Sequence, residues 1–367
     1  MFVNILKQDR TRSNMRELTL SYKQDAYGND ITALVFLPDE TPSAALPIGT
    51  AFPLQRHKIN AYHQPALIFH LGGFIVGSAA AVPKAQIQHL LGSGFAVVVP
   101  NYRLAPQITA KQAFQDCEDA YEWAIGALPA TITHQGGPSL DPSTVVAMGH
   151  SSGGTLALHL ASCKSIKAAT AFYPSLLLSD TSTSAHKPTM APPFGGMPDY
   201  EPSAEDWASI APQGRQISEA PLAAPGSVPA PRNKWQMQII KSGQWMPTVQ
   251  PDGDFAAIDP LTRLTGDWPP VMIVQGEVDN VPGSSFALAQ RADKEMKDAG
   301  VEKVALEIVP GQGHVFDLPP GASQAGDPRW VSVVRGLDWL TEHRAAPKRT
   351  PNWRARVPQL DVHIRYV

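Results

Sequence analysis

Ser151 stands in a sequence setting that is typical of a nucleophile. Apolar residues 145–148 predict a strand that stops at Gly149, and the residues from Gly153 to 160 have helical character. In a Gly-x-Ser-x-Gly turn the serine adopts a strained backbone that lifts its hydroxyl above the sheet edge, so its neighbours must be small. The start of the helix adds free N–H groups and partial positive charge beside a developing oxyanion. The motif also occurs in structural turns, but the strand before it and the helix after it favour a nucleophilic serine.

A serine hydroxyl needs a general base and a group that orients that base. Residues 271–274 predict a strand that is followed by Asp279, which we assign as the orienting carboxylate. Residues 304–309 predict the next strand, which leads through glycines into His314, and we assign His314 as the general base. Serine, then acid, then histidine is the chain order expected when such a triad sits on an α/β-hydrolase sheet.

Alternatives stay open at both positions. Glu277 is the rival acid, because it precedes Asp279 by two residues and alternation along a strand would point both side chains the same way. We favour Asp279, since the chain is expected to be turning there. A lone histidine after a strand is more often a surface or core residue, and it is the order relative to Ser151 that favours a role for His314.

Consecutive glycines follow a short apolar strand that is predicted at residues 66–70. Gly72 and Gly73 allow their backbone N–H groups to approach a substrate oxygen closely. With the N–H of Ser152 they are expected to form an oxyanion hole, in which the loss of one donor typically costs on the order of 10²–10³ in rate. Alone, the two glycines would favour a simple turn without a ligand.

The elements that must position these residues alternate along the chain. Strands are predicted at residues 18–22, 31–37, 66–70, 95–100, 144–148, 168–172, 271–274 and 304–309, and helices at 84–91, 111–128, 286–297 and 330–343. The first two strands are predicted to form a hairpin, and the later ones are uninterrupted apolar runs. Such runs indicate a mostly parallel sheet with helices on both faces. The fold class is therefore α/β, and we expect residues 1–367 to form a single domain.

The regular alternation is lost between residues 179 and 268. This stretch is rich in proline, glycine and serine, and it contributes to a total of 35 prolines, about twice the usual ~5%. A structureless loop of this length is unusual inside a compact domain, so the stretch is either an inserted lid or a disordered segment. A folded lid is favoured because apolar side chains are present to be buried, namely Trp207, Trp235, Met237, Trp245 and Met246.

The bulk composition argues against several classes of protein. A net charge of −3, from 30 basic and 33 acidic residues, gives no case for a nucleic-acid or anionic membrane partner. An apolar signal core and a stretch of membrane-spanning length are both missing, so we expect a soluble, cytoplasmic protein. Cys117 and Cys163 have no metal-like spacing, and we expect both to be buried, reduced thiols. Nothing in the sequence indicates an oligomeric state.

No cofactor or metal is expected. The glycine pairs form neither a dinucleotide-binding motif nor a phosphate-binding loop, and the chain has no His-Glu-x-x-His zinc motif. His57 and His63 have no carboxylate at ligand spacing. Asp116, Glu118 and Asp119 are expected to lie on the solvated face of their helix.

Together these segments resemble the hormone-sensitive-lipase-like α/β hydrolases. The family's H-G-G-G, Y-R-L-A-P and G-D-S-A-G-G motifs have counterparts in His70-Leu71-Gly72-Gly73-Phe74, Asn101-Tyr102-Arg103-Leu104-Ala105-Pro106 and Gly149-His150-Ser151-Ser152-Gly153-Gly154. Asp279 and His314 follow in the family's order, and the resemblance covers about residues 65–180 and 268–343. It implies hydrolysis of carboxylic esters with apolar acyl or aryl groups, without a cofactor. Tyr102 and Arg103 are expected to have structural roles.

The chain departs from the family motifs at three positions. Leu71 replaces the first glycine of H-G-G-G, while the two positions that the family uses as donors match Gly72 and Gly73. Ser152 replaces an alanine, which leaves its backbone N–H available. His150 replaces the aspartate before the nucleophile, and its imidazole either changes the charge of the pocket or packs against the sheet.

These residues predict a serine hydrolase that cleaves a carboxylic ester or lactone of an apolar or aromatic small molecule through an acyl-enzyme. The alternative is a non-hydrolytic enzyme on the same scaffold, a dehydratase, cyclase or acyl transferase acting on a natural product, because the large insertion carries tryptophans and methionines that suit a bulky ligand. A silent small-molecule receptor would be expected to lack a triad member. A prolyl-cleaving peptidase would need a propeller domain, for which the chain has no room.

Overall fold

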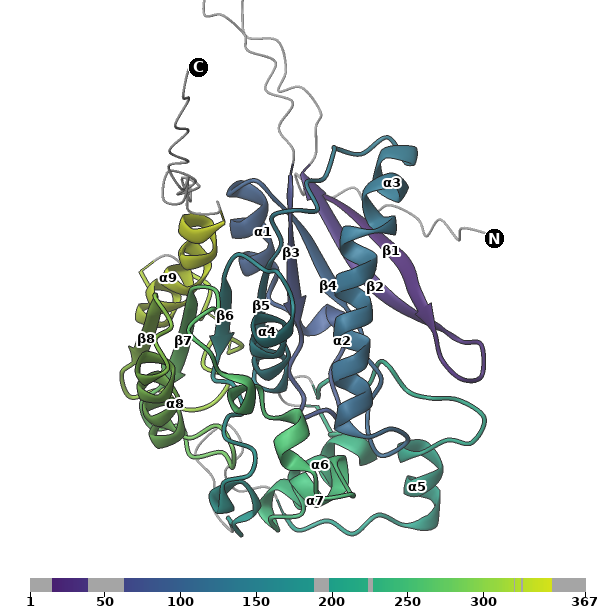
Figure 1. Ribbon diagram of the computed structural model, residues 1–367. Coiled ribbons are helices and arrows are strands. Elements are labelled where there is room, and N and C mark those ends of the chain that lie inside the picture. The colour runs from purple at the N-terminus through teal and green to yellow at the C-terminus, as the bar shows by residue number, and fades with distance from the viewer. Residues whose placement is uncertain are drawn as a thin grey trace, which may run out of the picture.

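An eight-stranded sheet forms the centre of the computed structural model, which describes residues 15–38, 63–187, 198–223, 227–319, 321–324 and 326–344. The strand order is β1-β2-β4-β3-β5-β6-β7-β8, and helices cover both faces of the sheet (Figure 1). β2 runs antiparallel to β1 and β4, whereas every pair from β4 onward is parallel. The predicted α/β class with a mostly parallel sheet is confirmed.

The strands lie close to their predicted positions. Their bounds are β1 Met15–Gln24, β2 Asp30–Pro38, β3 Gln64–Phe69, β4 Phe95–Pro100, β5 Val146–His150, β6 Ala169–Phe172, β7 Val271–Gly276 and β8 Val304–Val309. β4 and β8 match the prediction residue for residue. β4, β5 and β6 are buried along their whole length, because helices cover them on both sides. Two covered faces explain why these strands are uninterrupted apolar runs.

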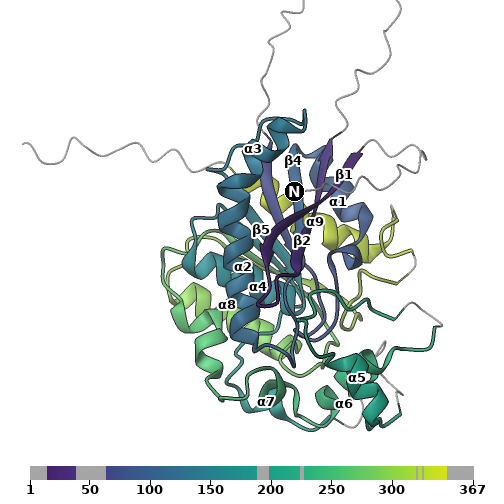
Figure 2. The same ribbon diagram turned by 90° about the vertical axis from the view of Figure 1, so that its right-hand side faces the viewer.

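The helices form a layer on each face of the sheet. Their bounds are α1 Lys84–Gly92, α2 Ala110–Ile125, α3 Ala127–His134, α4 Ser152–Cys163, α5 Ala204–Ile210, α6 Pro231–Lys241, α7 Trp245–Val249, α8 Phe286–Asp298 and α9 Pro328–His343, with short 3₁₀ turns at Ala79–Ala81, Thr181–Ser184, Phe255–Ile258 and Pro260–Arg263. α1 and α9 pack on one face, and α2, α4 and α8 on the other (Figure 2). None of the helices in the described ranges has the length and apolar character that a bilayer-crossing segment requires.

The helix predicted over residues 111–128 is wrong at its end. α2 stops at Ile125, and α3 starts two residues later as a separate helix. A Cβ atom at Gly126, which joins them, would lie only 2.9 Å from the carbonyl oxygen of Glu122. The sequence pattern runs through this break because α3 also carries apolar residues at helical spacing, Leu128 and Ile132, which are both buried.

The β6–β7 connection, which we define as residues 173–270, contains the predicted insertion. Its helices α5, α6 and α7 lie together at one end of the sheet (Figures 1 and 2). Trp235, Trp245 and Met246 are buried, whereas Trp207 is 40% exposed. The described residues of this stretch are therefore folded, and the assignment of the stretch as a lid stays a prediction. Residues 188–197 and 224–226 lie outside the described residues.

The two cysteines differ in their environment. Cys117 is buried in the middle of α2, as predicted, but Cys163 is exposed at the end of α4. The prediction of two buried thiols is thus wrong for Cys163. The residues of α4 before it are buried, and exposure begins only in the last turn of that helix.

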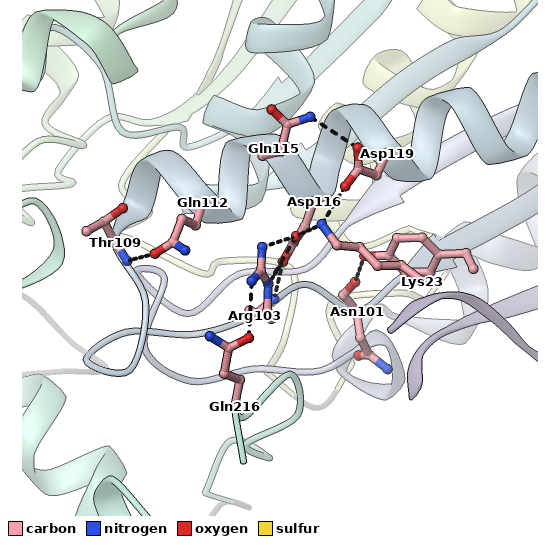
Figure 3. A network of polar contacts seen from close by, with 10 residues as sticks. Lys23, Asn101, Arg103, Thr109, Gln112, Gln115, Asp116, Asp119 and Gln216 are labelled. Carbon is pink, nitrogen blue, oxygen red and sulfur yellow. Dashed lines mark hydrogen bonds and ion pairs between the residues drawn. The ribbon is translucent and has the colours of Figure 1, made fainter. Parts of the chain in front are cut away.

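A buried ion-pair network holds the loop after β4 against α2 (Figure 3). Nη2 of Arg103 donates to Oδ1 of Asp116 at 2.7 Å, and Nε of Arg103 donates to Oδ2 at 2.8 Å. Lys23 of β1 donates to the same carboxylate at 2.5 Å. Arg103 therefore ties the end of β4 to its neighbours, as predicted. Asp116 is fully buried, so the prediction that it lies on a solvated face is wrong, and cations from two other elements neutralise it.

Replacing Asp116 with Asn should destabilise the fold, because it leaves the Arg103 and Lys23 cations without their shared anion. Breaking a buried pair typically costs about 3–5 kcal/mol of the free energy of unfolding. Asp119→Asn is the matched control, since Asp119 contacts Lys23 but its side chain is 36% exposed, and exposed pairs contribute about 1 kcal/mol or less. Urea unfolding followed by tryptophan fluorescence measures both variants, and equal losses would contradict the structural role given to Asp116.

Candidate active site

Ser151 occupies a strained turn between β5 and α4. Its backbone angles are φ 52° and ψ −122°, and its N–H donates to the carbonyl of Phe172 in β6 at 2.9 Å. A Cβ atom at Gly149 would lie 2.1 Å from the carbonyl oxygen of Gly153, and one at Gly153 would lie 2.2 Å from the carbonyl oxygen of Phe69. The turn therefore requires glycine at both flanks, as the motif predicts.

The structure brings Ser151, His314 and Asp279 into one hydrogen-bonded chain. The Ser151 hydroxyl donates to Nε2 of His314 at 2.9 Å, and Nδ1 of His314 donates to Oδ2 of Asp279 at 2.7 Å. All three residues are at most 8% exposed. An imidazole held in this way can accept a proton from the hydroxyl, while the carboxylate stabilises the charge that forms on the ring.

Asp279, and not Glu277, is the acid that faces His314. The Asp279 carboxylate also accepts hydrogen bonds from Nε2 of Gln275 at 3.0 Å and from the N–H of Val281 at 3.0 Å. Glu277 is exposed and accepts a hydrogen bond from the N–H of Gly311 instead. The two acids diverge because the strand ends at Gly276 and the chain turns before Asp279. Sequence reasoning missed Gln275, because it carries no motif and lies inside the apolar strand.

Gly72 and Gly73 lie in the loop after β3 and line the same cavity as Ser151 and His314. Their φ angles are +133° and +60°, which glycine adopts without strain. Among the described residues, no backbone or side-chain acceptor takes a hydrogen bond from the N–H of Gly72, Gly73 or Ser152. Gly72 and Gly73 thus share a cavity with Ser151, and Ser152 follows it in the chain, and the three N–H groups have no protein partner in the described parts of the chain.

The cavity beside Ser151 has mostly apolar walls. Its lining residues are Leu71, Gly72, Gly73, Ser151, Ser175, Leu222, Gln236, Met237, Ile240, Trp245, Val281, Pro282, Ser284 and His314. Six of them, Ser175, Leu222, Gln236, Met237, Ile240 and Trp245, come from the β6–β7 connection. Apolar walls with a few polar groups at one end are the usual composition of a pocket for a small apolar ligand.

A family model described as alpha/beta hydrolase fold matches residues 66–318, more than half of the chain. The chain belongs to this family. The match confirms the resemblance to hormone-sensitive-lipase-like hydrolases that the motifs indicated, and it includes every residue assigned to the site.

Curated relatives of this hydrolase are large polyketide synthases. It is 29% identical over 352 residues to the non-reducing polyketide synthase ascC of Acremonium egyptiacum, which covers 88% of this chain and 15% of that protein. It is 30% identical over 312 residues to the non-reducing polyketide synthase Preu6 of Preussia isomera, with 76% and 13% covered. The chain therefore spans about one seventh of the length of these relatives.

Solved structures of esterases share the fold of this hydrolase. Esterase 2 of Thermogutta terrifontis aligns with a TM-score of 0.54 and 18% identity, covering 91% of this chain and 95% of that one. Carboxyl esterase 2 of Tuber melanosporum aligns with a TM-score of 0.57 and 16% identity, covering 92% and 90%. At such low identity, the likeness extends to the fold alone.

His150, where the hydrolase departs from the family motif, faces away from the pocket. Its ring stacks on Phe172, with 5.1 Å between ring centroids, and its Nε2 lies 2.9 Å from Oε1 of Gln86 and 3.2 Å from Oδ2 of Asp317. The Asp317 pKa lies below its ordinary value: burial opposes this shift, and the neighbouring His150 charge and hydrogen bonds outweigh burial. Of the two alternatives for His150, packing against the sheet is the one that the structure shows.

One group of side chains in the described parts of the hydrolase has the spacing of metal ligands: Glu118, His159 and Cys163. Nε2 of His159 already donates to Glu118 at 2.9 Å, and Lys164 pairs with the other carboxylate oxygen at 3.1 Å. Arg263 donates to Nδ1 of His159 at 3.4 Å. Metal binding is opposed by the two neighbouring cations. It is also opposed by His159 itself, because its second nitrogen accepts a hydrogen bond, whereas the second nitrogen of a metal-binding histidine usually donates one.

His70 links the glycine loop to the strand that precedes it. Its Nδ1 donates to the carbonyl of Leu71 at 2.8 Å, its ring stacks on Tyr102 at 4.1 Å, and its Nε2 is buried without a partner among the described residues. Burial lowers the pKa of His70 to about 4, against a weaker opposing effect of the Leu71 hydrogen bond.

We expect His70 to make the fold sensitive to acid. Its folded pKa lies below the unfolded value of 6.5, so between pH 6.5 and 4 the unfolded chain binds a proton that the folded chain does not. The contribution of uncharged His70 to the free energy of unfolding is fully present above pH 6.5, and it is lost as the pH falls from 6.5 to 4. From pH 7 to pH 5, the free energy of unfolding should fall by about 2 kcal/mol more in the wild type than in His70→Gln. Urea unfolding at several pH values tests this, and parallel curves for the two proteins would contradict it.

Proposed function

We propose that the protein is a serine hydrolase that cleaves a carboxylic ester or lactone of an apolar or aromatic small molecule. The single observation that carries the proposal is the hydrogen-bonded chain from the Ser151 hydroxyl through His314 to Asp279. A buried serine bonded to a histidine that is itself oriented by a carboxylate has the arrangement of an activated nucleophile.

In the proposed reaction, Oγ of Ser151 attacks the carbonyl carbon while Nε2 of His314 takes the hydroxyl proton. The N–H groups of Gly72, Gly73 and Ser152 bind the oxyanion of the tetrahedral intermediate. The intermediate collapses to an acyl-enzyme, and His314 passes the proton to the leaving alcohol. Water then attacks the acyl-enzyme, again with His314 as the base, and the acid is released. Asp279 holds the imidazole and stabilises its charged form throughout.

The walls of the cavity support an apolar acyl or aryl group as substrate. Met237, Ile240 and Trp245 of the connection line the same cavity as Ser151, together with Leu71 and Val281. Among the described residues of this lining, none carries a charge apart from His314 when its ring is protonated. An anionic or strongly polar acyl group would lose its hydration there without a compensating partner.

The polyketide synthase relatives favour a second candidate, in which the acyl-enzyme is the same but its acceptor is not water. The acyl group would be of polyketide type, and a second hydroxyl or carbon nucleophile would take it, giving a transferred or cyclised product. Reaction in ¹⁸O-labelled water separates the candidates, because hydrolysis places one ¹⁸O atom in the released acid and transfer or cyclisation places none.

Ser151 should be the residue that becomes covalently modified. A fluorophosphonate should label the wild type once, at Ser151, and short p-nitrophenyl esters should be hydrolysed. Ser151→Ala should lose both the label and at least about 10³-fold in kcat/KM, because the acyl-enzyme cannot form. Intact mass spectrometry and peptide mapping locate the label. Ester hydrolysis that persists in Ser151→Ala would remove the serine from the mechanism.

The two acids after β7 provide a matched pair of variants. Asp279→Asn should lower kcat by about 10³–10⁴-fold, since an amide no longer holds the imidazole in the required tautomer. Glu277→Gln makes the same chemical change two residues away, on a side chain that is exposed and turned away from His314, and should stay within about 3-fold of the wild type. Steady-state kinetics with one p-nitrophenyl ester decide between the two. A larger loss in Glu277→Gln would overturn the assignment.

A further inference from the structure

We propose that Gln236 and Trp245 of the β6–β7 connection are positioning residues that orient the N–H donors of the glycine loop. This inference rests on the proposed function, because it assigns those N–H groups to the oxyanion. Nε2 of Gln236 donates to the carbonyl of Gly72 at 2.7 Å, and Nε1 of Trp245 donates to the carbonyl of Gly73 at 2.9 Å. Both side chains are buried, and both come from elements more than 160 residues away in sequence.

Because the peptide bond is planar, a contact that fixes a carbonyl group also fixes the N–H group of the same peptide unit. The carbonyl of Gly72 and the N–H of Gly73 belong to one trans peptide unit, so they point in opposite directions and rotate together. A hydrogen bond that fixes the Gly72 carbonyl therefore also fixes the direction of the Gly73 N–H. The bond from Trp245 fixes the next peptide unit, so the rotation about Gly73 is restrained on both sides.

The unit that precedes these two is held in the same way from within the loop. The N–H of Gly72 shares its peptide unit with the carbonyl of Leu71, which accepts the hydrogen bond from His70. Three successive peptide units of the loop thus each have a side-chain donor on their carbonyl. The Gly72 carbonyl also accepts the backbone N–H groups of Ile75 at 3.0 Å and Val76 at 3.1 Å, so Gln236 adds a side-chain donor to a local turn, whereas the Gly73 carbonyl is held by Trp245. Glycine has the least intrinsic restraint on φ and ψ, so these contacts together define the geometry of the Gly-Gly loop.

The packing around Gly73 shows how closely the connection approaches. A Cβ atom at Gly73 would lie 3.0 Å from Nε2 of Gln236 and 3.3 Å from Nε1 of Trp245. The Trp245 ring also lies parallel to Phe74, with an interplanar angle of 3°. The missing side chain at Gly73 is therefore what allows both donors to reach the loop.

Arg232 fixes α6 to the same loop one helical turn before Gln236. Its Nε donates to the carbonyl of Ile75 at 2.6 Å, and its two terminal nitrogens donate to the carbonyls of Ile210 and Ala105. Burial lowers the pKa of Arg232 to about 10. Residues four apart lie on one face of a helix, so this face of α6 binds the loop at both Gly72 and Ile75. Gly77 and Ala220 add two backbone hydrogen bonds between loop and connection.

Two variants remove the donors while keeping the shape of the side chains. Trp245→Phe keeps an aromatic ring beside Phe74, and Gln236→Met keeps the length of the side chain. Each should lower kcat/KM for a p-nitrophenyl ester by about 10- to 100-fold, less than the loss of a whole oxyanion donor, because the N–H is misdirected and not removed. The loss should fall on kcat, with KM changed by less than about 3-fold.

Controls and a second readout separate positioning from general damage. Trp235→Phe and Gln238→Met make the same changes on α6 at residues whose recorded partners are Trp207 and Tyr200 and not the carbonyls of the glycine loop, and they should stay within about 3-fold of the wild type. Fluorophosphonate titration gives the rate per competent serine, so a misfolded fraction does not count. A trifluoromethyl ketone, which forms a tetrahedral oxyanion on the serine, should bind the two test variants more weakly by the same factor as kcat/KM.

The outcomes are distinct. Parallel losses in kcat and ketone affinity support the proposal. An unchanged kcat per titrated serine, or a change confined to KM with unchanged ketone affinity, overturns it and leaves Gln236 and Trp245 as walls of the pocket. A wild type that neither reacts with the fluorophosphonate nor hydrolyses esters overturns the proposed function first, and this inference with it.

Discussion

The strained turn at Ser151 is the constraint on which the rest of the site depends. A non-glycine residue at φ 52° and ψ −122° is costly, by about 1–3 kcal/mol, and it persists only where the surroundings enforce it. Here β5 lies between β3 and β6, and the helix that follows packs so closely that Gly149 and Gly153 have no room for a Cβ atom. The parallel sheet therefore supplies the geometry of the serine, and the loops after β7 and β8 need only bring Asp279 and His314 to the same edge.

Sequence reasoning reached this site because each of its parts is local. Ser151, Asp279, His314 and the two glycines each follow an apolar strand, and the carboxyl ends of parallel strands meet at one edge of a sheet. The structure places His314 within hydrogen-bond distance of both Ser151 and Asp279, as that logic requires. Sequence reasoning could also choose Asp279 over its rival Glu277, because the chain turns after Gly276.

The parts that sequence reasoning missed depend on contacts between distant segments. The sequence pattern places Asp116 on the solvent-facing side of its helix. Its burial depends on Arg103 and Lys23, which come from other elements. Gln236 and Trp245 likewise look like ordinary residues of a proline-rich stretch, since a side chain that binds a backbone carbonyl leaves no periodicity or motif in the sequence. Burial of Trp235 and Trp245 was foreseeable from their apolar character, whereas the exposure of Trp207 and the hydrogen bond of Trp245 were not.

The β6–β7 connection has two tasks that lie on different residues of the same helix. Arg232 and Gln236 bind the glycine loop, whereas Met237 and Ile240 form part of the cavity wall. Because Met237 and Ile240 make no hydrogen bond to the loop, the shape of the cavity can change at those positions without breaking the contacts that hold the loop. Gln236 and Trp245 both line the cavity and bind the loop, so a substitution at either residue changes the cavity wall and the loop contact together. The connection and the glycine loop share three side-chain and two backbone hydrogen bonds, so moving α6 and α7 away as one body would release the contacts that hold the loop.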